Sequence, residues 1–148
     1  MEQGGCGCPP TTATAALGRV HHVFVNVKDL DRAREFYGWL MPRLGYGAMR
    51  DFGAVCGWMS ATGSFWMKAA DPRFAHDDFH KDRVGLAEIA FAAGSRDDVD
   101  ALARALDGRG ATVLDAPREY PEYVPGYYAV FFTDPDGLKL ELVHIPGA

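Results

Sequence analysis

The feature that most constrains the fold of this chain is an internal duplication. The stretches HHVFVNVKD and AEIAFAAGS align without a gap when His22 is laid over Glu88. Each stretch continues into a helical pattern and then into short β-like runs separated by turns. Self-similarity at a fixed spacing marks a repeated supersecondary unit, here of about 65 residues. The sequence therefore predicts two copies of a strand, a helix and two or three further strands.

The first strand of each copy alternates between two faces. One face is apolar, with Val25 in the first copy and Phe91 in the second. The opposite face carries small, polar or aromatic residues, which are His22, Phe24 and Asn26 in the first copy and Glu88, Ala90 and Ala92 in the second. Amphipathic helices are expected to cover the apolar faces, because the apolar stripes of the helices match them. The uncovered faces are candidate walls of a ligand cavity.

Helical 3–4 spacing of apolar residues follows each of these strands. The first helix is predicted to begin at an N-cap of Asp29 or Asp31. The second helix is predicted to begin at Ser95 and to end at Gly108 or Gly110. These limits place one helix directly after the first strand of each copy.

The remaining segments set the domain organisation. Residues 1–18 read as a flexible tail rich in Gly, Pro, Thr and Ala, followed by a single domain over residues 19–148. In that domain we expect a first module at about 19–70, a polar linker at about 71–83 and a second module at about 84–146.

Composition and charge limit the partners and the compartment. The chain has 148 residues, of which 48% are hydrophobic, and a net charge of -5, which disfavours a nucleic-acid partner. No apolar run approaches the ~20 residues that span a bilayer, and the N-terminus makes a poor signal peptide. We therefore expect a cytoplasmic protein with no membrane partner. Cys6, Cys8 and Cys56 are interpreted as free thiols, with a redox or metal-scavenging tail as the alternative.

Three candidate metal ligands fall on the predicted cavity-facing phases of different strands: His22, Glu88 and Glu141. One imidazole and two carboxylates suit a divalent ion such as Mn, Fe, Co, Ni or Zn, with positions left for water or substrate. Such an ion polarises a carbonyl or stabilises an enediolate, and Glu88 or Glu141 is the candidate catalytic base. The alternative is a metal-free cavity in which Glu88 pairs with His22 or with an arginine.

A substrate pocket is predicted around these ligands. Its expected lining residues are Phe24, Asn26, Trp58, Phe65, Met67, Tyr120, Tyr123 and Tyr127. The three tyrosines belong to or follow the proline-rich stretch 117–126, which is predicted to form a rigid loop at the pocket rim. The acidic and histidine-containing linker 76–82 is interpreted as solvated rather than as a second metal site.

The stretch HHVFVNVKDLDRAREFYGWLMPRLGY and the ending YYAVFFTDPDGLKLELVH resemble the glyoxalase, bleomycin resistance protein and extradiol dioxygenase superfamily, also called vicinal oxygen chelate. The resemblance covers about residues 19–145, and its motifs are specific for the superfamily rather than for one activity. It implies an α+β fold in which two βαβββ modules form a curved, cup-like mixed β-sheet with helices on the outer face. In enzymes of this superfamily the first and last strands of each module typically hold a divalent metal.

Position by position, the resemblance assigns His22 and Glu141 to ligand sites. Glu88 stands where members usually have histidine, which departs from the pattern of extradiol dioxygenases and of fosfomycin thiol transfer. The fourth ligand position aligns near Trp66 or Met67, so the usual acid of glyoxalase I is missing.

Two functions follow as expectations. The leading one is a metal-dependent lyase or isomerase of glyoxalase type that acts on a small oxygenated molecule. The alternative is a metal-free protein of bleomycin-resistance type that binds a drug-like aromatic or cationic molecule; an extradiol dioxygenase is less favoured. The fold does not decide between them. The sequence also leaves open whether the modules pair within one chain or between the two chains of a homodimer.

Overall fold

The computed structural model describes residues 18–147, and within this range it confirms the duplicated architecture. The elements in chain order are β1 (His22–Val27), α1 (Leu30–Arg43), β2 (Arg50–Asp51), β3 (Val55–Met59), β4 (Ser64–Ala69), η1 (Pro72–Phe74), β5 (Ile89–Ala92), α2 (Arg96–Arg109), β6 (Val113–Glu119), β7 (Tyr128–Thr133) and β8 (Lys139–His144). Apart from Gly18, the tail expected over residues 1–18 lies outside the described residues, and so do Cys6 and Cys8.

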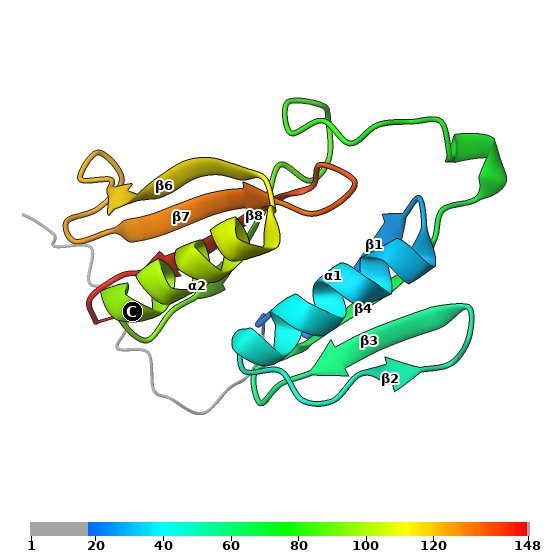
Figure 1. Ribbon diagram of the computed structural model, residues 1–148, viewed down its shortest axis with the longest axis horizontal. Helices are drawn as coiled ribbons and strands as arrows, with labels where there is room; N and C mark the ends of the chain where they lie inside the picture. The colour runs from blue at the N-terminus through cyan, green and yellow to red at the C-terminus, as the bar shows by residue number, and fades with distance from the viewer. Residues whose placement is uncertain (1–17, 148) are drawn as a thin grey trace, which may run out of the picture.

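Each module forms its own four-stranded mixed sheet. The strand orders are β1-β4-β3-β2 and β5-β8-β7-β6, which are equivalent (Figure 1). In both sheets the first and last strands of the module pair in parallel, and the other neighbours are antiparallel. The two sheets do not join, because β1 and β5 each lie at a sheet edge without a strand partner in the other module.

The caps that define both helices are local. The side chain of Asp29 accepts hydrogen bonds from two backbone N–H groups in the first turn of α1. The hydroxyl of Ser95 likewise accepts from the backbone N–H of Asp98 at the start of α2. At the other end of α2, Gly110 has a φ of 72°, which glycine adopts without the steric cost of a Cβ. Both predicted helices are thus confirmed.

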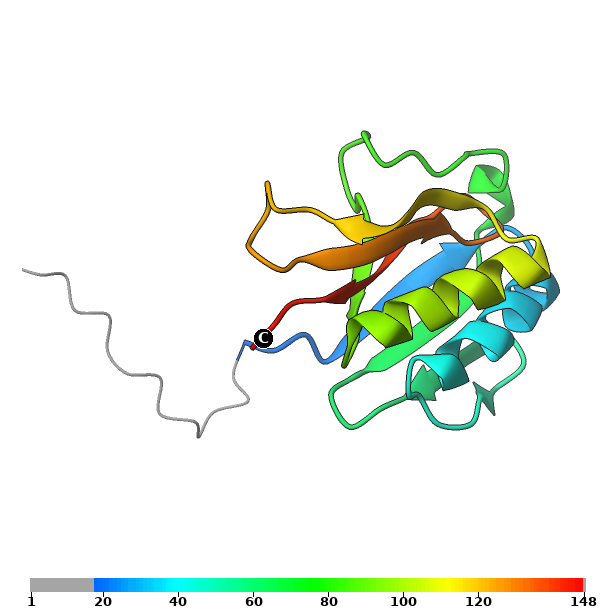
Figure 2. The same ribbon diagram turned by 60° about the vertical axis from the view of Figure 1, so that its left-hand side comes forward.

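The hydrophobic core lies between the helices and the sheets. Both helices lie on the same side of the molecule, α1 against the first sheet and α2 against the second (Figure 1 and Figure 2). Val25 and Val27 of β1 face α1 and are buried, and Phe91 of β5 is buried below α2. The apolar phases identified from the alternation are therefore the helix-facing ones.

The two modules contact each other on the helix side. The Tyr37 hydroxyl on α1 donates to Asp134 Oδ2 in the β7–β8 turn at 2.8 Å. The Arg109 guanidinium at the end of α2 lies 3.0 Å from Glu35 on α1. These contacts and the shared core hold the modules together although their sheets do not exchange strands.

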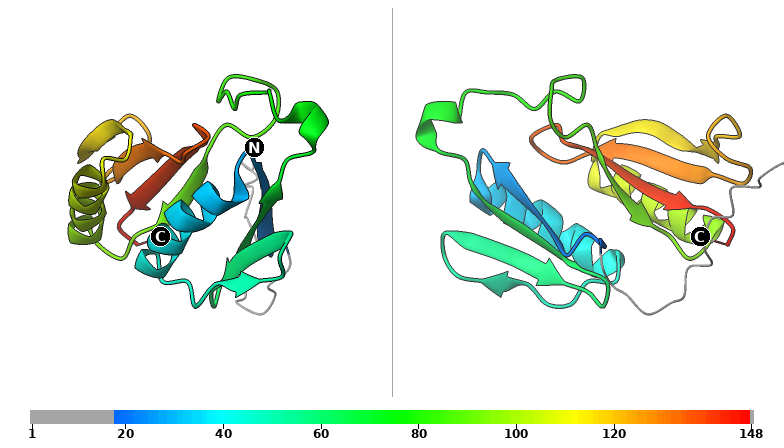
Figure 3. Two further views of the ribbon diagram at one scale, coloured as in Figure 1. Left: turned by 45° about the vertical axis from the view of Figure 1, so that its right-hand side comes forward. Right: turned by 180° about the vertical axis from the view of Figure 1, so that it is seen from behind.

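The linker runs from β4 to β5 as η1 and an irregular segment beyond the ends of the two sheets (Figure 3). Phe79 packs its ring against the core, while Asp78 forms an ion pair with Lys28. Within residues 18–147, no helix has the length and apolar character needed to cross a bilayer.

Candidate functional site

The candidate site lies on the sheet faces that turn away from the helices, which we call the cup faces. Viewed from behind, the strands of both modules lie in front of their helices (Figure 3, right). Strand alternation places His22, Phe24 and Asn26 of β1 on the cup face, because the valines between them face α1. Glu141 lies on the cup face of β8, and Glu88 directly precedes β5.

Glu141 is the most deeply buried acid of the cup faces, with 1% of its surface exposed. It lies between Ala90 of β5 and Phe131 of β7, and its Oε1 accepts a hydrogen bond from the Tyr127 hydroxyl. Burial raises the pKa of the Glu141 carboxyl, and the negative charge of Glu88 adds to this rise. The Tyr127 hydroxyl and the Lys139 ammonium act in the opposite direction but do not cancel it. Glu141 is therefore a carboxyl that binds a proton more readily than a solvated glutamate.

Glu88 is neutralised by Lys139 of the neighbouring strand. The Lys139 Nζ lies 2.6 Å from Glu88 Oε2, and both side chains are about one-third exposed or less, at 25% and 36%. The same ammonium lies 4.2 Å from the centroid of the Phe131 ring, within the range of a cation–π contact. Glu88 is thus a paired charge, and its partner is a lysine rather than His22 or an arginine.

Three tyrosines form the wall next to Glu141. The rings of Tyr120 and Tyr123 stack at 5.6 Å, and the ring of Tyr127 meets that of Tyr123 edge-on at 5.2 Å. Tyr120 is buried beneath the Arg118 guanidinium, and burial together with Asp115 raises its pKa to about 12. Burial and Glu141 also raise the pKa of Tyr127. The hydroxyls of Tyr120 and Tyr127 therefore stay protonated at neutral pH. Of the three tyrosines, Tyr123 is the one whose side chain is well exposed.

In the first module, Trp66 stands at the position equivalent to Glu141. The strand registers pair Phe24 with Trp66 and Ala90 with Glu141, and Phe24 is the repeat counterpart of Ala90. The Trp66 ring lies on Gly57 of β3, where an added Cβ would come within 2.4 Å of it. Phe52 stacks on this ring at 6.1 Å. An aromatic surface thus occupies the place where the second module has its buried acid.

Among the described residues, His22 does not form a ligand cluster with the two glutamates. Its side chain is exposed, and its Nδ1 lies 3.0 Å from Nδ1 of His21. It borders a small cavity of about 160 Å³ together with Ser64 and Ala90. The structure brings Glu88 close enough to Glu141 for their charges to interact, but it does not add His22 to them.

The residues present do not fit a divalent metal. Among residues 18–147, no three His, Cys, Asp or Glu side chains converge in a way that could hold an ion. Glu88 is paired with an ammonium, and Glu141 accepts from a tyrosine hydroxyl. A metal bound by these two carboxylates would lie next to the Lys139 cation, which disfavours it electrostatically.

Trp58, Phe65 and Met67 do not line the cup, contrary to the pocket predicted from the sequence. Each is 0–1% exposed and packs into the core below α1, although Phe65 also borders the small cavity next to His22. The sequence left Trp66 and Met67 as alternatives for the position equivalent to Glu141, and the parallel pairing of β1 with β4 places Trp66 there. Successive side chains of a strand point to opposite faces, so with Trp66 on the cup face Phe65 and Met67 point into the core.

Of the other predicted pocket residues, Tyr120 is 2% exposed and belongs to a buried aromatic cluster, whereas Phe24, Asn26, Tyr123 and Tyr127 remain at least partly accessible. Phe24 is 47% exposed, and with Asn26 it borders a cavity of about 380 Å³ between β1, the linker and the β7–β8 turn. The linker side chains His76, Asp77, Asp78, His80 and Asp82 are all exposed, consistent with a solvated segment. His80 and Asp78 reach this cavity from the linker side.

Lys139 is the functional residue that sequence reasoning missed. Lys139 lies two residues before Glu141, so the alternation of the strand already indicated that both side chains face the cup. Its partner is set by the parallel pairing of β5 with β8, in which Ile89 lies opposite Leu140 although the two are far apart in the chain. No local pattern specifies such a contact.

Comparisons with known proteins agree with this geometry. A family model described as Glyoxalase/Bleomycin resistance protein/Dioxygenase superfamily matches residues 19–142. The uncharacterized protein YqjT of Bacillus subtilis (strain 168) is 35% identical over 124 residues, which are 84% of this chain and 97% of that protein.

Two crystal structures are also similar. One, from Bacillus halodurans and provisionally named a glyoxalase, has a TM-score of 0.76 and 32% identity, covering 87% of this chain and 97% of that one. The other is a glyoxalase/bleomycin resistance protein from Albidiferax ferrireducens T118, with a TM-score of 0.70, 26% identity and coverage of 84% and 98%.

Proposed function

Because the chain belongs to the glyoxalase/bleomycin resistance protein/dioxygenase superfamily, we propose that it binds a small molecule on its cup faces and does so without a resident divalent metal. The proposal favours the metal-free alternative over the metal-dependent lyase or isomerase that the family pattern first suggested. It rests on one observation, the ion pair between Lys139 and Glu88.

This ion pair supplies the positive charge that a metal would otherwise provide. A buried carboxylate next to a second, partly exposed one is costly unless a cation compensates them. The Lys139 ammonium contacts Glu88 and also lowers the pKa of Glu141, so one cation serves both acids. A divalent ion would have to displace it or share its space at a large electrostatic cost.

The surroundings of these acids favour an aromatic or cationic ligand. Both cup faces expose large aromatic side chains, Phe24 and Phe52 in the first module and Tyr123 in the second. Exposed aromatic surface next to a partly compensated carboxylate is suited to flat rings and to organic cations. The half-buried Trp66 ring adds a stacking surface in the first module.

A second function is favoured by the state of Glu141. A buried carboxyl whose pKa is raised, and which accepts a hydrogen bond from a tyrosine hydroxyl, has the properties of a general acid or base. In this second function, the bound molecule would transfer a proton to the Glu141 carboxylate, and no metal would take part. If Glu141→Gln abolished substrate turnover but retained ligand binding, this result would identify Glu141 as the acid or base of an enzyme.

Metal analysis of protein purified without chelator tests the metal-free proposal. We expect no stoichiometric divalent ion in the wild type, and the same result for Glu88→Ala and Glu141→Ala. A bound ion at one per chain that is lost in both variants would overturn the proposal and restore the metal-dependent enzyme.

Tryptophan fluorescence tests ligand binding directly. Trp58 is buried and Trp39 lies on α1, so Trp66 is the indole on the cup face. Aromatic cations are expected to quench the wild-type signal saturably, with and without EDTA, and to leave Trp66→Phe unquenched. Quenching that persists in Trp66→Phe would place the ligand elsewhere.

A further inference from the structure

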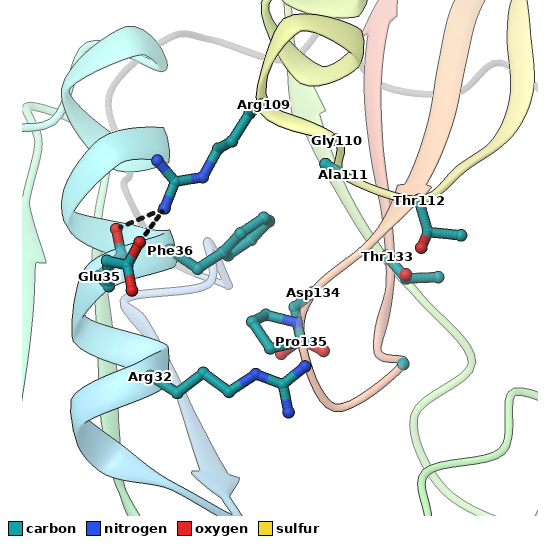
Figure 4. A pocket seen from close by; sticks show the side chains of 11 residues that line it. Arg32, Glu35, Phe36, Arg109, Gly110, Ala111, Thr112, Thr133, Asp134 and Pro135 are labelled. Carbon is teal, nitrogen blue, oxygen red and sulfur yellow. Dashed lines mark hydrogen bonds and ion pairs between the residues drawn. The ribbon is translucent and has the colours of Figure 1, made fainter.

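A second cavity lies on the helix side of the molecule, away from the cup faces, where the two modules meet. It has a volume of about 510 Å³. Its lining comes from α1, from the segment after α2 and from the end of β7 with its following turn (Figure 4). A cavity of this size is within the range of small-molecule sites.

Two arginines reach this cavity from different modules. Arg109 extends from the end of α2 to α1, where its Nη2 donates to Glu35 Oε1 at 3.0 Å (Figure 4). Arg32 extends from α1 toward Pro135 in the β7–β8 turn (Figure 4). Arg32 takes part in none of the ion pairs formed among residues 18–147, so its guanidinium is an available donor.

The carboxylates of the cavity are already engaged, which leaves an excess of donors. Asp134 accepts hydrogen bonds from the Tyr37 hydroxyl and from the backbone N–H groups of Asp136 and Leu138. Glu35 is occupied by Arg109. The free polar groups are therefore the Arg32 guanidinium and the hydroxyls of Thr112 and Thr133.

We propose that this cavity binds a phosphate group, either free or carried by a small molecule. Its donors come from α1, from the end of α2 with the segment that follows it, and from the end of β7, and arginine side chains bind phosphate oxygens through charge-assisted hydrogen bonds. Phe36 is only 6% exposed and provides an apolar wall for an attached organic group. A phosphate held by Arg32 and Arg109 bridges the two modules and stabilises their pairing.

Glu35 competes with the phosphate for Arg109. Because of this competition, we expect two substitutions to change the affinity for phosphate in opposite directions. Arg32→Gln removes a donor, so binding should weaken about tenfold or more, the loss expected for a charge-assisted hydrogen bond. Glu35→Gln removes a negative charge and releases Arg109, so binding should tighten severalfold.

Titration calorimetry with inorganic phosphate and glycerol 3-phosphate tests the proposal, with acetate and glycerol as reference probes. Arg104→Gln on α2 is the matched control, because it removes one positive charge outside the cavity and should leave binding unchanged. If glycerol 3-phosphate binds more tightly than inorganic phosphate, the natural ligand is a phosphate ester. If the two bind equally, the natural ligand is free phosphate.

Three results would overturn the proposal: absence of saturable phosphate binding, equal affinity for acetate, or equal losses in Arg32→Gln and Arg104→Gln. Circular dichroism of each variant separates a loss of binding from a loss of fold. Since Glu35→Gln is expected to gain affinity, its result cannot be imitated by misfolding.

Discussion

Glu141 is a buried carboxyl whose neighbours compensate only part of the cost of burying its charge. Its surface is 1% exposed, and the pKa of its carboxyl is raised by that burial despite Tyr127 and Lys139. A carboxyl whose pKa is higher in the folded than in the unfolded chain favours folding at low pH. This contribution is lost as the pH rises through the folded pKa.

Replacement of Glu141 by glutamine should therefore raise stability at neutral pH. The glutamine carbonyl can still accept from the Tyr127 hydroxyl, but it carries no charge to desolvate. We expect the free energy of unfolding at pH 7 to increase by about 1 kcal/mol. The difference from the wild type should disappear below the pKa of an unfolded glutamate, about 4.3.

Urea unfolding at several pH values measures this difference. Glu122→Gln in the exposed β6–β7 loop is the control and should show little pH-dependent change. A Glu141→Gln variant that is less stable at pH 7, by an amount independent of pH, would contradict the assignment of Glu141 as a carboxyl of raised pKa.

At the scale of elements, the β3–β4 pair is built around the contact of Gly57 with Trp66. A Cβ at position 57 would meet the indole at 2.4 Å and the backbone oxygen of Phe65 at 2.5 Å. Since the second contact is with backbone, the strand itself would have to shift. Glycine is therefore required here by space.

Gly57→Ala should destabilise the protein by about 2 kcal/mol, the typical cost of an overpacked site. Gly38 in α1 has open space around its Cβ position, so Gly38→Ala should instead stabilise by about 0.5–1 kcal/mol through helix propensity. Thermal unfolding of both variants provides the comparison. Equal effects of the two substitutions would show that the Trp66 contact does not constrain β3.

The parallel pairs β1–β4 and β5–β8 decide which residues reach the cup. The alternation of β1 alone was sufficient to place His22, Phe24 and Asn26 correctly. The alternation of β4 was equally clear, but its phase relative to β1 depends on the crossover through α1, β2 and β3. The predicted pocket consequently included Phe65 and Met67, which the sheet register places in the core.

At the scale of the whole molecule, the Tyr37–Asp134 hydrogen bond joins the two modules through their shared core. Tyr37 is fully buried and Asp134 is 5% exposed. Burial raises the pKa of Asp134, and the Tyr37 hydroxyl lowers it. Removal of this hydroxyl would leave a carboxylate oxygen unpaired inside the protein.

Tyr37→Phe should thus lower the free energy of unfolding by about 1–3 kcal/mol, the cost of leaving one buried polar partner unsatisfied. Tyr128→Phe removes a comparable hydroxyl, which donates to Asp100 at 2.8 Å within the second module, and should cost less because both residues are partly exposed. Chemical denaturation of the two variants measures the difference. Equal losses would indicate that the contact between modules contributes nothing beyond an ordinary hydrogen bond.

The sequence by itself determined the repeated modules, the presence of a helix after the first strand of each module, and the cup-facing positions of His22 and Glu141. Each of these follows from periodicity or capping within a few residues, and such signals are local. The placement of Glu88 beside a compensating charge was also foreseeable, because a carboxylate next to an apolar strand needs one.

Only the tertiary structure decided which residue compensates the charge of Glu88, which side chains of β4 face the cup, and where the two modules meet. Lys139 reaches Glu88 through the β5–β8 pairing, and Arg32 and Arg109 reach one cavity because α1 and the end of α2 lie together. These contacts join segments far apart in the chain. Their partners are selected by packing of the shared core, which no local pattern encodes.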